Sequence, residues 1–362
     1  MKLSSTCSPN FRIGDKVIGE GNPVYFVADI AANHDGDLER AKDLINLAKE
    51  AGADAAKFQH FNAETIVSDY EFRRQKGLQS HQSTWKRSVF EVYSMASVDL
   101  NWSPVLKETC DKAGIEFMTS PYSYTLADHI DPYLNAYKIG SGDITWIDYL
   151  EYVAKKKKPM LLATGAASFE DAVRAIQAIQ EYNRDICVMQ CNTNYTGSID
   201  NFKFVNLRVL QCYRIMFPDC VLGLSDHTPG HSAVLGAVAL GARVIEKHFT
   251  DSNDRDGPDH KFSLTPAAWR DMVDATLELD YALGNGIKRV EPNEQATVVV
   301  QRRSLCAARD LPAGSVIQAD DLIPLRPCPP KSFPPYETDN LVGRTLKSDV
   351  HYGQSILRDD LA

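Results

Sequence analysis

The segment 221–228 reads VLGLSDHT, an apolar run that ends in serine, aspartate, histidine and threonine. The segment 243–250, RVIEKHFT, is also mainly apolar at its start and ends in glutamate, lysine, histidine, phenylalanine and threonine. A strand that is apolar on both faces is typical of a parallel sheet covered by helices. The two segments therefore predict a buried parallel sheet with chemically active side chains at the carboxyl ends of its strands.

Six further runs of the same kind extend this pattern along the chain. They are 24–31, 55–61, 116–122, 136–141, 159–165 and 186–193. Stretches with apolar residues at helical spacing alternate with the runs, at 38–51, 168–182 and 268–283. Eight β–α units over about 260 residues predict an α/β fold of the (β/α)8 TIM-barrel type. A doubly wound sheet is the alternative, but it usually carries a Gly-x-Gly-x-x-Gly turn after its first strand, and the sequence lacks that turn.

A smaller unit follows the predicted barrel. The composition changes near 284–293, GNGIKRVEPN, and a Pro-rich segment covers 302–362. Its short strand candidates are 304–308, 322–325 and 356–357. We expect a catalytic barrel over 1–285 and a small domain over 286–362. Because about 60 residues alone are marginal for stability, the small domain is expected to pack on a barrel, its own or a partner's.

Composition narrows the class of protein. The 362 residues contain 39 Lys and Arg against 48 Asp and Glu, and the formal net charge of −9 argues against broad nucleic-acid binding. No run of about 18 apolar residues occurs, and no apolar signal-peptide core is found near the start. The eight cysteines form no Cys-x-x-Cys pair, and several of them stand in apolar runs, where a free cysteine behaves as a small hydrophobic residue. We therefore expect a cytoplasmic protein without a nucleic-acid or membrane partner.

Two lysines stand inside otherwise apolar predicted strands. The carboxyl ends of barrel strands meet at one rim, where such enzymes carry their active site. Lys57 and Lys138 are each interpreted either as a snorkelling or ion-paired structural residue or as part of an anion site. The second interpretation groups them with Ser120, Ser141 and the backbone of 140–142, because phosphate and carboxylate need several convergent donors and positive charge.

Two histidines end two neighbouring predicted strands. Adjacent strands are about 5 Å apart, so His227 and His248 can reach one ion. A lone histidine at a strand end is usually a hydrogen-bonded core residue, but two with open positions suit Mn²⁺, Fe²⁺, Co²⁺ or Zn²⁺. The acidic residues that could complete such a site, directly or through water, are Asp29, Asp226, Glu246 and Asp259.

Six short motifs resemble the sialic acid synthase family, which includes N-acetylneuraminate, legionaminate and pseudaminate synthases. In chain order they are AANHDG (31–36), AKFQ (56–59), KIGSGD (138–143), GLSDHT (223–228), EKHFT (246–250) and GPDH (257–260). The tail from residue 302 resembles the family's C-terminal antifreeze-like (SAF) domain. Each motif alone is weak evidence, whereas the ordered set covers nearly the whole chain and is specific.

This resemblance implies a phosphoenolpyruvate-dependent condensation with an N-acetylated amino sugar, such as N-acetylmannosamine or a 2,4-diacetamido-trideoxyhexose, giving a sialic or nonulosonic acid and phosphate. It also implies a divalent metal, usually Mn²⁺ with Mg²⁺ or Co²⁺ as alternatives, and a domain-swapped homodimer. The residues that match phosphoenolpyruvate contacts or the site lining are Lys57, Ser120, Lys138, Ser141, Ser225, Asn194 and Tyr195. Those that match metal ligands are His227 and His248, and those that match sugar contacts are Gln59, Tyr122, Asp259 and, from the other subunit, Arg326.

Two acidic residues depart from the family pattern. Asp29 stands where the family usually has Glu, and Asp143 where it often has Glu. Each change shifts the carboxylate by about 1.5 Å, enough to alter positioning. We predict that Asp29 or Asp143 is the general acid or base or positions water. The segment after Arg326 is Pro-rich where many members have a Gly-containing loop, so the acceptor sugar is left open. Alternatives are a 3-deoxy-sugar-acid synthase acting on a phosphorylated aldose, a metal aldolase, or a non-catalytic sugar-binding relative.

Overall fold

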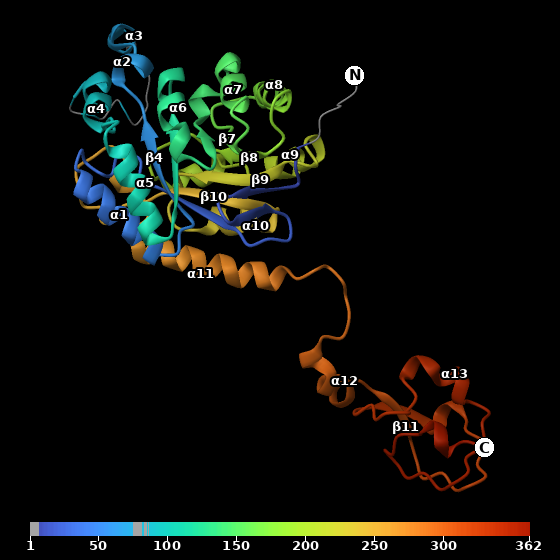
Figure 1. The fold of residues 1–362 in the computed structure, drawn as a ribbon. Coiled ribbons are helices and arrows are strands. Elements are labelled where there is room, and N and C mark those ends of the chain that lie inside the picture. The colour runs from blue at the N-terminus through green and yellow to red at the C-terminus, as the bar shows by residue number, and fades with distance from the viewer. Residues whose placement is uncertain (1–6, 75–81, 83–84, 86) are drawn as a thin grey trace. The chain divides into compact units, whose positions relative to one another are not determined.

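The computed structural model describes residues 7–74, 82, 85 and 87–362 (Figure 1). The chain divides into two compact units, the first ending at Gly284 and the second spanning Asn285–Ala362. Within the described ranges, no helix combines the length and apolar character needed to cross a bilayer.

The first unit is a parallel α/β barrel. Its eight strands pair in the order β5-β4-β3-β10-β9-β8-β7-β6, and β5 lies against β6 so that the ring nearly closes. The strands are β3 (Tyr25–Asp29), β4 (Ala55–His60), β5 (Glu116–Pro121), β6 (Tyr137–Ile139), β7 (Met160–Ala163), β8 (Ile186–Cys191), β9 (Val221–Asp226) and β10 (Ala242–His248). Each falls on a predicted run, and the predicted (β/α)8 barrel is confirmed.

Helices surround the ring of strands (Figure 1). They are α1 (Leu38–Glu50), α2 (Ala63–Ile66), α3 (Asp69–Arg74), α4 (Val89–Ala96), α5 (Trp102–Ala113), α6 (Tyr124–Ile130), α7 (Ile147–Ala154), α8 (Phe169–Gln180), α9 (Val209–Met216), α10 (Ser232–Ala239) and α11 (Pro266–Leu283). Side-chain caps start several of them: Asp37 accepts from the backbone N–H groups of Glu39 and Arg40 at the start of α1. The inner faces of the helices and the outer faces of the strands form one apolar core.

The interior of the ring changes character along the strands. At the amino ends, an apolar cluster packs around a hairpin of β1 (Asn10–Ile13) and β2 (Lys16–Gly19), which the sequence analysis did not predict. Tyr25 and Val27 belong to this cluster, and Asp29 follows them on the same strand. Because side chains alternate between the two faces of a strand, these three side chains point into the ring.

The second unit has its own small core. It contains α12 (Gln295–Gln301), the antiparallel strands β11 (Ser304–Ala307) and β12 (Leu322–Leu325), and α13 (Thr338–Leu341). A cluster of ten buried apolar residues holds it together. The strand predicted at 356–357 is replaced by isolated bridges, one of which joins Ser332 to Leu357.

One pair of cysteines is bonded, which the sequence patterns did not predict. Cys7, ahead of β1, and Cys220, ahead of β9, form a disulfide between residues 213 positions apart, with their Cα atoms 4.8 Å apart. The other six cysteines, all in described segments, are free. Rules based on short Cys spacings cannot detect a bond that the barrel topology creates between distant segments.

Candidate active site

The carboxyl ends of the strands bring together the lysines and histidines that the sequence singled out. The strand register places Asp29 beside Lys57 on β4 and beside His248 on β10, and it places Glu246 beside Ser225 on β9. These residues share the inward-pointing face of their strands, as the alternation along each strand requires. The predicted anion-binding and metal-binding groups therefore meet inside one end of the ring.

Buried ion pairs connect the two lysines. Lys57 Nζ lies 2.6 Å from Asp29 Oδ2 and 3.9 Å from Glu246 Oε1, while Lys138 Nζ lies 3.3 Å from the same Glu246 oxygen. All four side chains are at most 6% exposed, so neither lysine snorkels to solvent. Burial acts to lower the pKa of Lys57, but the Asp29 and Glu246 carboxylates raise it above its ordinary value.

Three polar atoms of this cluster are buried without a hydrogen-bond partner in the described part of the chain. They are Ser120 Oγ, Glu246 Oε2 and His248 Nδ1. The other carboxylate oxygen of Glu246 accepts from the Ser225 hydroxyl at 3.1 Å. Buried polar groups in native proteins nearly always have partners, so three open ones around two lysines indicate a place that a polar ligand completes.

Ser141 and the β8 end form the neighbouring wall. Ser141 Oγ accepts from the Gly165 N–H at 3.0 Å. A Cβ at Gly165 would overlap the Thr193 hydroxyl and come within 2.9 Å of Ser141 Oγ, so the close approach requires glycine. Thr193 thus lies beside Ser141. The amide oxygen of Asn194 instead accepts from the Thr196 hydroxyl at 2.7 Å, in a local turn.

Asp29 is held in one orientation by donors on three sides. Its Oδ1 accepts from the Ala31 N–H at 3.1 Å. Its Oδ2 accepts from Lys57 at 2.6 Å and from the Gln59 amide at 3.2 Å. The Asp29 carboxylate is therefore fully engaged by its own neighbours.

Two further carboxylates have pKa values close to neutrality. Burial raises the pKa of Asp143 to about 6, with Lys138 acting in the opposite direction. Burial also raises the pKa of Asp259 to about 6, although the Ala32 N–H, 3.2 Å from its Oδ2, lowers it. Carboxyl groups of this kind can both donate and accept a proton near pH 6.

The two predicted metal ligands face each other, with ring centroids 5.3 Å apart. His227 donates from Nδ1 to the Asn192 carbonyl at 3.0 Å. Burial lowers the pKa of His248 well below its ordinary value, and the nearby His227 and Lys57 lower it further. A neutral imidazole with an open Nδ1 is what a metal ligand requires.

The acidic residues around this pair are more distant. Asp29 Oδ2 lies 3.5 Å from His248 Nε2, and Asp259 Oδ2 lies 4.0 Å from His248 Nδ1. In the described segments, no group of three or more His, Cys, Asp or Glu side chains is arranged to hold a metal ion. The described residues therefore bring two imidazoles side by side without completing a set of metal ligands around them.

Cys191 is part of the site although the sequence analysis treated it as a small hydrophobic residue. Burial acts to lower the pKa of His227, but a hydrogen bond to Cys191 raises it overall. Burial likewise acts to raise the pKa of Cys191, and its bonds to His227 and Ser141 lower it. Its place on the strand, two residues after Met189 on the inner face, is a signal that could have identified it.

Two tyrosines line the same region. The Tyr195 ring centroid lies 4.4 Å from that of His227 and 6.1 Å from that of His248. Tyr122 packs edge-on to Phe61 at 6.1 Å. Burial raises the pKa of both tyrosines well above the ordinary value, so their hydroxyl groups stay protonated and can donate. Arg326 follows β12 in the second unit and is exposed to solvent.

Comparison with known proteins identifies relatives along the whole chain. Residues 44–288 match the NeuB family and residues 302–362 match the SAF domain. The N,N'-diacetyllegionaminic acid synthase of Legionella pneumophila is 33% identical over 95% of this chain and 96% of its own. The N-acetylneuraminate-9-phosphate synthase of Homo sapiens is 32% identical over 94% of each chain. The crystal structure of N-acetylneuraminic acid synthetase from Leptospira borgpetersenii, in complex with citrate, matches with a TM-score of 0.71 and 27% identity, over 81% of this chain and 96% of that one.

Proposed function

The chain belongs to the NeuB family of synthases and carries a SAF domain, and from this premise we propose that it condenses phosphoenolpyruvate with an N-acetylated amino sugar. The products are a sialic or other nonulosonic acid and inorganic phosphate. Relatives named as synthases of legionaminic, neuraminic and pseudaminic acids support this choice of reaction. The single observation that carries it is the buried pair of Lys57 and Lys138, bridged by Glu246 and surrounded by unpartnered polar atoms.

Phosphoenolpyruvate suits the lysine side of the site because it presents a phosphate and a carboxylate. Lys57 and Lys138 supply the positive charge, and the hydroxyls of Ser120, Ser141 and Ser225 supply further donors. Lys138 is the lysine more easily turned toward substrate, since its contact with Glu246 is 3.3 Å whereas Lys57 is 2.6 Å from Asp29. Holding both anionic groups in line lowers the barrier by several kcal/mol of entropic cost, within the roughly 7–11 kcal/mol that ideal alignment can supply.

The acceptor sugar suits the histidine side. Gln59, Tyr122, Tyr195 and Asp259 present amide, hydroxyl and carboxyl groups there, and we assign them to the sugar. His227 and His248 would hold the divalent metal, for which Mn²⁺ is our choice and Mg²⁺ or Co²⁺ are alternatives. Such an ion, when bound, polarises a carbonyl oxygen and stabilises negative charge on it.

The reaction then uses the remaining residues as follows. The enol carbon of phosphoenolpyruvate forms a bond to the aldehyde carbon of the open-chain sugar, water adds to the adjacent carbon, and the C–O bond to phosphate breaks. Lys57 and Lys138 keep the phosphate and carboxylate in place throughout. Asp143, with a pKa of about 6, is the candidate proton donor or acceptor. Asp29, fixed by three donors, is the candidate for orienting the water.

Two finer assignments follow the family resemblance. We assign Asn194 to the site-lining segment, although its amide oxygen is engaged by Thr196. We also propose a domain-swapped homodimer, in which Arg326 of one subunit reaches the sugar bound by the other. Size measurement by light scattering and complementation between Arg326→Ala and Lys57→Met subunits test this assembly.

A screen of acceptors tests the proposed function. The protein, phosphoenolpyruvate and Mn²⁺ are incubated with N-acetylmannosamine, with 2,4-diacetamido-trideoxyhexoses and, as the control, with arabinose 5-phosphate. We expect one phosphate released per product, with a product mass equal to both substrates plus water minus phosphoric acid. Turnover with arabinose 5-phosphate alone, or binding without turnover across all amino sugars, would contradict the proposal.

A further inference from the structure

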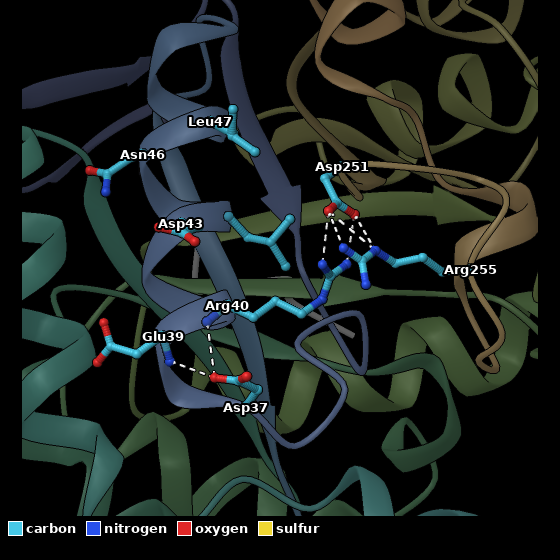
Figure 2. Close-up of a pocket in the computed structure, with 9 residues that line it drawn as sticks. Asp37, Glu39, Arg40, Asp43, Asn46, Leu47, Asp251 and Arg255 are labelled. Carbon is cyan, nitrogen blue, oxygen red and sulfur yellow. Dashed lines mark hydrogen bonds and ion pairs between the residues drawn. The ribbon is translucent and has the colours of Figure 1, made fainter.

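A groove of about 560 Å³ lies beside α1, where Arg40, Asp251 and Arg255 meet (Figure 2). Acidic residues of α1 and its cap, among them Asp37 and Glu39, make up much of the rest of its lining. The excess of carboxylates makes it a poor site for an anionic ligand. Arg40 and Arg255, at the edge of the groove, both bind Asp251, and through Arg40 this contact connects two loops of the barrel.

Arg40 makes contacts in two directions. Its two terminal nitrogens donate to the two carboxylate oxygens of Asp251, at 2.8 and 2.6 Å. Its Nε donates to the Asn33 carbonyl at 2.7 Å and lies 3.1 Å from Asp35 Oδ2. The side chain is only 12% exposed. Arg40 therefore joins the β3–α1 loop (residues 30–37) to the β10–α11 loop (residues 249–265).

Arg255 provides an internal comparison. It also binds Asp251, at 2.9–3.2 Å, but its side chain is 45% exposed and it stands four residues away on the same loop. In the described residues its ion pair is with Asp251, a member of its own loop. Both guanidinium groups thus contact one carboxylate (Figure 2). Arg40 is the one that links this carboxylate to the neighbouring loop, through the Asn33 carbonyl.

Further ties continue from Arg40 toward the active site. His260 Nε2 lies 2.9 Å from Asp35 Oδ1, and the Asn33 amide donates to Ser263 Oγ at 2.9 Å. Ser263 in turn donates to the Asp259 carbonyl at 2.6 Å. The innermost tie is the 3.2 Å bond from the Ala32 N–H to the Asp259 carboxylate. Hydrogen bonds and ion pairs therefore connect the β10–α11 loop, which carries Asp259, to the β3–α1 loop. They extend from Arg40 at the protein surface to Asp259 in the site.

We propose that Arg40 is a positioning residue, which clamps the β10–α11 loop so that Asp259 stays at the sugar side of the site. Arg40 does not touch the site: it acts through Asp251 and through the Asn33 and Asp35 segment. The assignment rests on the proposed function, because that function gives Asp259 its role. A lysine cannot replace Arg40, since it lacks the planar fork that binds a carboxylate with two parallel hydrogen bonds.

Gly257, in the β10–α11 loop, supports the same inference. A Cβ at this position would come within 2.6 Å of the His260 ring and 3.5 Å of Asp35 Oδ1. The loop backbone therefore packs directly against the His260–Asp35 pair. Gly257→Ala should weaken the contact between the two loops without removing a charge, and it serves as a second, independent test.

Hydrogen–deuterium exchange and steady-state kinetics test the clamp together. In Arg40→Ala we expect exchange of residues 249–265 to quicken about 10-fold, because a local opening becomes easier. We expect the KM for the amino sugar to rise by about 10-fold with the KM for phosphoenolpyruvate unchanged, since a misplaced binding group weakens the ligand it contacts. Arg40→Lys and Gly257→Ala should shift both readouts in the same direction, and Arg255→Ala should leave them within about twofold.

Hydrogen–deuterium exchange is measured without substrate turnover, so it tests the role of Arg40 independently of the proposed reaction. Unchanged exchange at 249–265 in Arg40→Ala overturns the clamp even if the enzyme condenses the two substrates as proposed. An equal effect of Arg255→Ala, or equal rises in KM for both substrates, also overturns it. If Arg40→Ala loses its cooperative unfolding transition, Arg40→Lys supplies the same comparison with the positive charge retained.

Discussion

The two ends of the barrel ring are built from the same strands but contain opposite chemistry. At the amino ends, Tyr25 and Val244 pack with the β1–β2 hairpin in a cluster of buried hydrophobic residues. Two to four residues further along, the inner faces carry Asp29 and Glu246 within a network of buried charges. Strand, register and alternation are shared, so the difference lies in the side chains alone.

This contrast separates the residues that stabilise the fold from those that act on substrate. An apolar interior contributes free energy of unfolding in proportion to the area it buries. Four buried charges contribute little to stability, because the loss of hydration offsets much of their attraction. The buried charges at the carboxyl end are therefore not explained by the stability of the fold. We expect substitutions at the carboxyl end to reduce activity and those at the amino end to reduce the free energy of unfolding.

The largest effect is expected from the lysines. Lys57→Met or Lys138→Met keeps most of the side-chain length and removes the positive charge that would hold phosphoenolpyruvate. We expect phosphate release to fall by at least about 10³-fold, in line with the loss of a preorganised electrostatic group. The exposed Lys203, 71% exposed, provides the control Lys203→Met. Near-normal turnover in both site variants would remove the distinction between the two ends.

The next effect concerns metal binding. His248→Ala removes a proposed ligand. Loss of a residue that only hydrogen-bonds a metal ligand lowers metal affinity by roughly 10–100-fold, so we expect loss of the ligand itself to lower the Mn²⁺ affinity by more than that. Calorimetric titration with Mn²⁺ measures this directly. His351→Ala, at an imidazole that is 77% exposed in the second unit, is the matched control. Stoichiometric metal retained by His248→Ala would contradict the assignment.

The amino end should respond in the opposite way. Ile18 is 1% exposed in the apolar cluster, so Ile18→Ala should cost about 2–5 kcal/mol of unfolding free energy and leave kcat unchanged. Urea unfolding followed by tyrosine and tryptophan fluorescence measures the first quantity. Ile199→Ala, at a residue 78% exposed, is the control for loss of the same atoms. A loss of kcat without loss of stability in Ile18→Ala would show that the ends are not separable.

The smallest effect is a pH dependence at the carboxyl end. The pKa of Asp143 is raised by burial to about 6, so the folded state binds its proton more tightly than the unfolded chain does. This group therefore stabilises the fold at low pH, and its contribution is lost as pH rises through about 6. Asp143→Asn should remove this loss, on the order of 1 kcal/mol after solvent screening. Urea unfolding of both proteins at pH 4.5 and pH 7.5 measures the difference, and an identical change in both would contradict it.

The sequence predicted the contrast better at one end than at the other. Long apolar runs ending in polar residues were sufficient to place Lys57, Lys138, His227 and His248 at the same end of the barrel. The hairpin at the amino end escaped prediction because each of its strands has four residues and mixes polar with apolar side chains. Such short strands are stabilised by packing against the barrel interior. These contacts involve residues distant in the sequence, so the local sequence pattern does not predict them.

Within the site, sequence patterns identified residue types but not partners. The contact of Glu246 with both lysines depends on the register between β9, β10 and their neighbours. Cys191 was missed as a site residue because its surroundings come from the next strands in the ring. The clamp at Arg40 was missed for the same reason, since its partner Asp251 is 211 residues away in the chain.

A crystal structure of the protein with phosphoenolpyruvate and Mn²⁺, with anomalous scattering to locate the metal, shows whether both bind inside the carboxyl end of the barrel. We expect a manganese peak between His227 and His248, with the phosphate and carboxylate of phosphoenolpyruvate contacting Lys57 and Lys138 in the same ring interior. Metal and phosphoenolpyruvate bound away from these four side chains would contradict it.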